Sequence, residues 1–136
     1  MDIFKKLTEL NFPLGHYVLV GSAPLAARGL REANDLDIAV TGVLWEELTN
    51  SGDYVLEKRY GRQFLVDKKS GEIDIIRQLD WDKYPTTVEE AILGADVIKG
   101  FPFLNISETI KFKTALGREK DFRDIEALRD YLKIKK

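Results

Sequence analysis

The sequence predicts an α+β fold in which a mixed or antiparallel sheet is flanked by helices. Two strand-like runs, residues 54–60 and 62–68, adjoin across Gly61 as in a hairpin. Strand-like and helix-like runs are mixed along the chain and do not follow the regular alternation of a parallel α/β sheet. The 136 residues are 44% hydrophobic and 32% charged, which fits one globular domain over 1–136.

The first part of the chain is predicted to mix helices with buried strands. Apolar residues at helical spacing follow Asp2, a suitable N-cap, and Pro13 stops this first helix. A second helix is expected to begin at Ser22, directly after a strand that ends in Gly21. The expected elements are a helix over 2–11, a strand over 16–21, a helix over 22–30, a strand over 35–40 and a helix over 41–52.

The second part begins with the hairpin and ends in helices. Thr87 and Glu90 have the spacing of a capping box, which predicts a helix start. Ser107 is expected to cap a helix that runs to Ala115, and a final helix with a charged outer face begins at Glu119. The expected elements are strands over 54–60, 62–68 and 72–76, a helix over 87–94, a short hairpin over 96–104, and C-terminal helices over about 107–134.

Composition excludes several classes of function. The 21 Lys and Arg against 23 Asp and Glu give a formal charge of −2, so no global basic field indicates nucleic-acid binding. The absence of cysteine excludes disulfides, thiolate metal sites and cysteine nucleophiles. The N-terminus is too polar for a signal peptide, and no apolar run reaches the roughly 18 residues of a membrane span. We expect a soluble cytoplasmic protein with no membrane partner.

Three acidic residues occupy unusual places in predicted strands. In "NDLDIAV", Asp35 and Asp37 are two residues apart, so they share one face of a strand at a spacing of roughly 6.5 to 7 Å. In "EIDII", Asp74 also alternates with apolar residues and projects away from the core. Asp is disfavoured in strands. One explanation is an exposed edge strand that uses charge to prevent aggregation; the other is a functional site.

A divalent metal would explain three carboxylates on one side of a sheet. Without a cation they raise one another's pKa, whereas a bound metal keeps them ionised. Oxygen ligands suit Mg²⁺, which binds few protein carboxylates together with water and substrate phosphates. The sequence therefore predicts Mg²⁺ as cofactor, with Asp35, Asp37 and Asp74 as its ligands and as the catalytic acids.

The predicted turn at Gly21 and Ser22 is a candidate phosphate site. It closes a strand immediately before a helix, where free N–H groups favour an anion. Gly21 allows close approach to the backbone, and the Ser22 hydroxyl suits either a helix cap or a phosphate oxygen. Such a pair also occurs in many ordinary turns.

Together, Gly-Ser, twelve intervening residues, Asp-x-Asp and a later strand acid resemble the active-site pattern of the DNA polymerase β-like nucleotidyltransferase superfamily. The resemblance implies a mixed sheet with helices against it. It implies that Gly21 and Ser22 bind a triphosphate and that Asp35, Asp37 and Asp74 hold Mg²⁺.

The tail "LNISETIKFKTALGREKDFRDIEAL" looks like the C-terminal helices of small bacterial and archaeal members of this superfamily. The family pattern of a Lys on one helix and Lys-Asp-x-x-Asp on the next falls here on Lys111 or Lys113, Lys120, Asp121 and Asp124. We expect Lys111 and Lys120 to reach the nucleotide; the other interpretation is a solvated face with weak ion pairs. Asn34 before the first acid and Pro24 in the turn differ from the usual family pattern.

The leading hypothesis is a Mg²⁺-dependent nucleotidyltransferase that moves a nucleoside monophosphate from a nucleoside triphosphate to an acceptor hydroxyl. The resemblance implies a protein, a transfer RNA or a small molecule as acceptor. The alternative is a catalytically silent nucleotide-binding or toxin–antitoxin module of the same fold. A solely structural domain, the third reading, requires the three acids to lie far apart.

Overall fold

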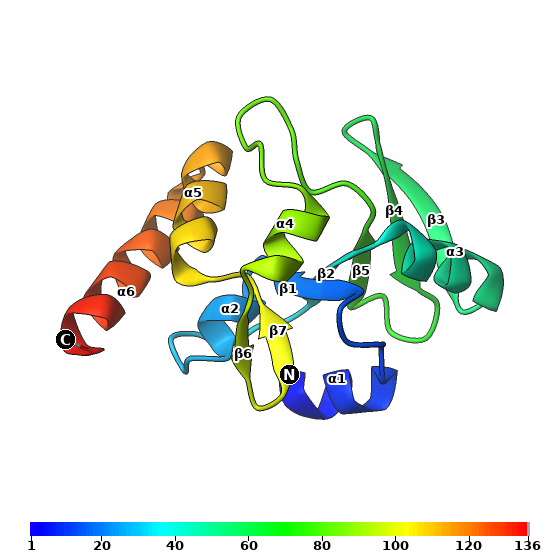
Figure 1. Ribbon diagram of the computed structural model, residues 1–136, viewed down its shortest axis with the longest axis horizontal. Coiled ribbons are helices and arrows are strands. Elements are labelled where there is room, and N and C mark those ends of the chain that lie inside the picture. The colour runs from blue at the N-terminus through cyan, green and yellow to red at the C-terminus, as the bar shows by residue number, and fades with distance from the viewer. Residues whose placement is uncertain (136) are drawn as a thin grey trace.

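A seven-stranded mixed sheet forms the centre of the computed structural model, which describes residues 1–135 (Figure 1). The strand order is β3-β4-β5-β2-β1-β7-β6. β2 pairs in parallel with β5 and β1 with β7, while the other neighbours are antiparallel, so the predicted α+β class is confirmed. The strands are β1 (Tyr17–Val20), β2 (Leu36–Val40), β3 (Tyr54–Arg59), β4 (Arg62–Asp67), β5 (Ile73–Ile76), β6 (Asp96–Ile98) and β7 (Phe101–Phe103).

Six helices lie before, between and after these strands in the described residues 1–135. Two predicted starts are confirmed: Asp2 accepts a hydrogen bond from the Lys5 N–H, and Thr87 and Glu90 form the capping box. The helices are α1 (Ile3–Leu10), α2 (Ala23–Ala26), α3 (Gly42–Ser51), α4 (Val88–Leu93), α5 (Ile106–Leu116) and α6 (Glu119–Lys135).

Three local boundaries differ from the prediction. The second helix has only four residues, because the chain after it continues in turns: the Arg28 and Gly29 N–H groups bond to the third residue before, and the Leu30 N–H reaches back to the Leu25 carbonyl. Asp35 lies in a bend just before β2, whose first ladder bond runs from the Leu36 N–H to the Glu72 carbonyl at 2.8 Å. Asn105, not Ser107, caps α5 through a 2.8 Å bond from the Glu108 N–H.

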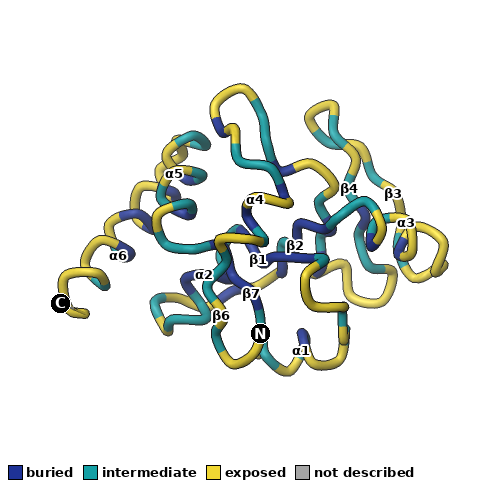
Figure 2. Tube along the Cα trace, in the orientation of Figure 1, coloured by how far each residue is buried: buried dark blue, intermediate teal, exposed yellow. Residues whose placement is uncertain are grey.

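Both faces of the central strands are covered (Figure 2). One face, with Leu19 and Ile38, packs against α1 and α3. On the other, Val20 and Ala39 contribute to a second core with α4. This second face also carries Asp37 and Asp74, at positions that alternate with the first core. The second face is therefore apolar where α4 covers it and carries charged side chains toward β5 and β3.

The C-terminal helices α5 and α6 stand together beyond one end of the sheet (Figure 1). Tyr84, in the long connection before α4, donates a 2.7 Å hydrogen bond to Glu108 on α5, which fixes that helix to the sheet layer. The outer side of α6 is largely exposed (Figure 2). Within residues 1–135, no helix is both long and apolar enough to cross a bilayer.

Candidate active site

Two of the three predicted acids are direct neighbours. Asp37 on β2 and Asp74 on β5 are register partners across the parallel pair, so their side chains lie next to each other on the same face of the sheet. Both are partly buried, whereas Asp35 is exposed and precedes the strand. The arrangement does not match the widely separated acids that a solely structural domain requires.

The predicted glycine turn lies directly against Asp37. Val20 pairs with Asp37 across β1 and β2, and Gly21 follows with a φ of +70°. A Cβ atom on Gly21 would come 2.3 Å from the Oδ2 atom of Asp37, so a side chain there would force the Asp37 carboxylate to move. Ser22 is the N-cap residue of the short α2, and its side chain makes no capping hydrogen bond. The turn and the first strand acid thus belong to one structural unit.

The Asp37 carboxylate is in an electrostatically unfavourable place. Burial raises its pKa, and the charges of Asp35 and Asp74 raise it further, to about 7. The positive charges of Lys113 and Arg59 oppose the rise, but no hydrogen bond from a described residue contributes to lowering it. A bound cation would therefore stabilise the ionised form of Asp37 strongly.

Asp74 already has a cationic partner. Arg59, the last residue of β3, donates from Nη1 to Oδ2 at 2.9 Å and from Nη2 to Oδ1 at 3.4 Å. The sequence-based prediction missed Arg59, although its alternation with Glu57 in the hairpin strand places both on one face. This contact is possible because Arg59 and Asp74 share the second face of the sheet across β4.

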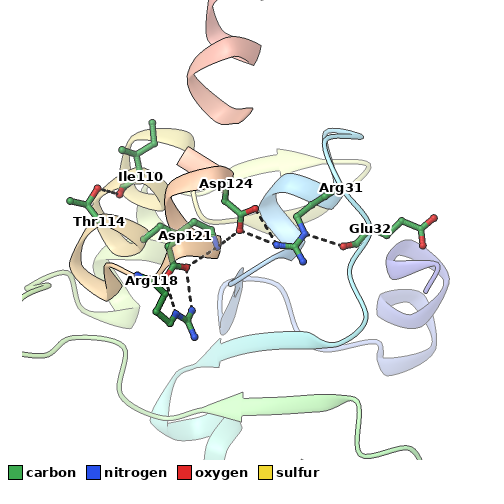
Figure 3. Close-up of polar contacts among 8 residues, drawn as sticks. Arg31, Glu32, Ile110, Thr114, Arg118, Asp121 and Asp124 are labelled. Carbon is green, nitrogen blue, oxygen red and sulfur yellow. Dashed lines mark hydrogen bonds and ion pairs between the residues drawn. The ribbon is translucent and has the colours of Figure 1, made fainter. Parts of the chain in front are cut away.

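A buried ionic network connects α5 and α6 beside the sheet. Lys113 is 4% exposed, and its Nζ atom lies 2.9 Å from Asp124 and 3.8 Å from Asp121. Arg31 holds the other side of Asp124 at 3.0 and 3.1 Å, and Arg118 holds Asp121 (Figure 3). Asp121 and Asp124 of the predicted tail pattern therefore lie in a buried ionic network, and the buried lysine of the pattern is Lys113 and not Lys111.

Arg118 is the second basic residue that the sequence-based prediction missed. Arg118 donates three hydrogen bonds to the Asp121 carboxylate: from its backbone N–H at 3.1 Å, from Nε at 2.7 Å and from Nη2 at 3.2 Å. Burial alone would raise the pKa of Asp121, but these bonds and the charges of Arg118 and Lys113 hold it below its usual range. The hydrogen bond to Asp121 is the main cause that raises the pKa of Arg118, and the charge of Asp37 adds a smaller contribution from the acidic site.

The lysines expected to reach the nucleotide occupy the surface. Lys111 is exposed and lies 3.3 Å from Glu108, and Lys120 is exposed at the start of α6. Arg28 is directed away, toward the Pro24 carbonyl and Asp96. Lys113 and Arg59, by contrast, carry positive charges that lower the pKa of Asp37.

The donor set at the acids fits Mg²⁺ in a specific way. Within residues 1–135, no three His, Asp or Glu side chains form a ready-made metal cage. Mg²⁺, however, commonly binds one or two carboxylates and keeps water and phosphate oxygens as its other ligands. No hydrogen bond from a described residue satisfies the Asp37 carboxylate, and Asp74 lies beside it, so Asp37 with Asp35 or Asp74 suits such an ion.

Replacing Gly21 tests the fit between the turn and Asp37. Gly21→Ala is expected to lower the free energy of unfolding by about 3 kcal/mol or more, because it adds a clash with a partly buried carboxylate to left-handed strain. Gly71→Ala is the matched control: Gly71 has the same φ of +70°, but its Cβ would meet nothing within 4 Å. It should cost only about 1 to 2 kcal/mol in urea unfolding. Equal losses in both variants would contradict the close packing.

Known proteins offer few matches. No protein-family profile and no curated protein matches the chain. Among solved structures, an antigenic nucleotidyltransferase-like protein from Paracoccidioides brasiliensis is similar, with a TM-score of 0.44 and 17% sequence identity. The match covers 93% of this chain and 71% of that chain.

Proposed function

We propose that the protein is a Mg²⁺-dependent nucleotidyltransferase of the DNA polymerase β-like kind, which transfers a nucleoside monophosphate from a nucleoside triphosphate to an acceptor hydroxyl. The observation that carries this proposal is the pairing of Asp37 with Asp74 directly against the Gly21 turn. Paired carboxylates suit a metal-bound phosphate, and the turn suits close approach of a phosphate to the backbone.

The basic residues around the acids suit a triphosphate. Arg118 is held in place by the buried Asp121, and Lys113 lies within the same network. Both carry positive charge toward Asp37, and the Ser22 hydroxyl, which makes no capping hydrogen bond, adds a donor at the turn. We assign Ser22, Gly21 and Arg118 to phosphate binding; Lys111 and Lys120 remain candidates for phosphates that extend beyond the site.

The reaction requires one bond to form and one to break. The acceptor oxygen bonds to the α-phosphorus, the bond from that phosphorus to the bridging oxygen of the β-phosphate breaks, and pyrophosphate leaves. We assign Asp74, as one of the metal ligands, to receive the proton of the acceptor hydroxyl, and Arg118 to balance the negative charge of the departing pyrophosphate. Lys113 adds positive charge from within its buried network. When bound, Mg²⁺ supplies Lewis-acid activation and charge neutralisation at the phosphates.

An acceptor screen with labelled nucleotide tests this proposal. The protein is incubated with Mg²⁺, each of the four nucleoside triphosphates labelled at the α-phosphate, and a panel of proteins, transfer RNAs and small hydroxyl compounds. We expect label to appear on one class of acceptor, with an equal amount of pyrophosphate released. Binding of nucleotide without transfer to any acceptor in the panel would favour the catalytically silent module.

A further inference from the structure

The third acid of the proposed site is occupied by a cation of the chain itself. The two Arg59–Asp74 hydrogen bonds, at 2.9 and 3.4 Å, cover both oxygens of the carboxylate. A guanidinium in this position satisfies the same negative charge that a divalent ion would. A metal ion and Arg59 therefore compete for Asp74.

The side chain of Arg59 has a defined path to Asp74. Arg59 lies at the end of β3, two strands away from β5, and its guanidinium carbon is 5.3 Å from the centre of the Phe64 ring on the intervening β4. This cation–π contact with Phe64 stabilises the guanidinium at a point on its way across β4 to Asp74. The pair with Asp74 is thus built by the hairpin and does not arise from a loose surface contact.

The same arrangement allows Arg59 to leave. Its side chain is 37% exposed and packs in neither apolar core, so its movement leaves both cores intact. Glu57, two residues earlier on the same face of β3, lies 3.4 Å from the Nη2 atom and offers another acceptor. Arg59 therefore keeps a partner when it releases Asp74.

We propose that Arg59 is a positioning residue that withholds Asp74 from a divalent cation until a nucleoside triphosphate binds. The phosphates give the guanidinium a new anionic partner, and Asp74 becomes available to the metal in the same event. This inference rests on the proposed function, because it takes Asp74 as a metal ligand. It makes metal binding dependent on nucleotide.

Manganese binding tests this role without reference to activity. Free Mn²⁺ is measured by electron paramagnetic resonance during titration of the nucleotide-free full chain, for wild type, Arg59→Gln, Arg59→Lys, Asp74→Asn and the double variant Arg59→Gln/Asp74→Asn. Arg62→Gln is the matched control, because Arg62 faces Arg59 across the hairpin but donates only to the Gln78 and Asp80 carbonyls. Circular dichroism melting confirms that each variant is folded.

We expect Arg59→Gln to bind Mn²⁺ about tenfold more tightly than wild type, the order of one competing charge-assisted pair. Arg59→Lys, which loses the two-point contact, should lie between them and serves if Arg59→Gln does not fold. The gain should be absent in Arg62→Gln and in the double variant. An equal gain in Arg62→Gln, or a gain that survives Asp74→Asn, would overturn this inference while the proposed function stands. Absence of Mn²⁺ binding in every protein, even with nucleoside triphosphate present, would overturn both.

Discussion

Asp37→Asn is expected to reduce nucleotide transfer by at least about a thousandfold while the fold is retained, because it removes the carboxylate on which metal binding depends. Asparagine has nearly the same shape as aspartate, so the packing against Gly21 is preserved. The measurement is the rate of label transfer to the acceptor under saturating Mg²⁺ and nucleotide. A transfer rate equal to that of the wild type would exclude Asp37 from the mechanism.

The stability of the same variant provides the control for folding. Burial and the neighbouring acids raise the pKa of Asp37 to about 7, above the unfolded value near 3.9. The folded metal-free protein therefore loses stability as the pH rises from about 4 through 7, since ionised Asp37 opposes folding. Asp37→Asn escapes this loss, so in EDTA at pH 8 it should be more stable than wild type by up to about 4 kcal/mol. Urea unfolding at pH 5 and pH 8 measures the difference, which should be larger at pH 8.

Lys113→Met is expected to destabilise the protein by about 3 to 5 kcal/mol, because it leaves the buried carboxylates of Asp121 and Asp124 short of a cation. Lys111→Met is the matched control two residues away on the same helix. Lys111 is exposed and lies near only Glu108, so its loss should change the free energy of unfolding by less than about 0.5 kcal/mol. Both are measured by urea unfolding at pH 7.

The two lysine variants also separate a structural role from a surface role. If both cost the same small amount, the network of α5 and α6 contributes little to stability. If Lys113→Met alone is destabilised, a further Asp124→Asn change should restore part of the loss, because it removes a carboxylate that has lost its lysine partner.

Much of this fold is predictable from periodicity. The hairpin, the capping box at Thr87 and the alternation of Asp37 and Asp74 with apolar residues all depend on local rules, and the structure follows them. The short α2 was missed because a run of alanines and leucine is compatible with a longer helix, and only the turns that follow show where it ends.

The site was predictable only in part, because its charges come from segments far apart in the sequence. Asp37 and Asp74 become neighbours through the parallel pairing of β2 with β5, which no local pattern specifies. The role of Arg59 depends on a side chain that crosses a whole strand. The local sequence pattern fits Lys113 and Lys111 equally well, and only the packing of α5 on α6 shows which of the two is buried.

The acids and the Gly21 turn are proposed to form one site for a magnesium nucleotide. Isothermal titration calorimetry of the full chain with each of the four nucleoside triphosphates, in Mg²⁺ and then in EDTA, tests this site most directly. We expect binding heat with at least one nucleotide in Mg²⁺, and we expect that heat to be lost in EDTA and in Asp37→Asn. No heat with any of the four, or the same heat in Asp37→Asn as in wild type, would contradict it.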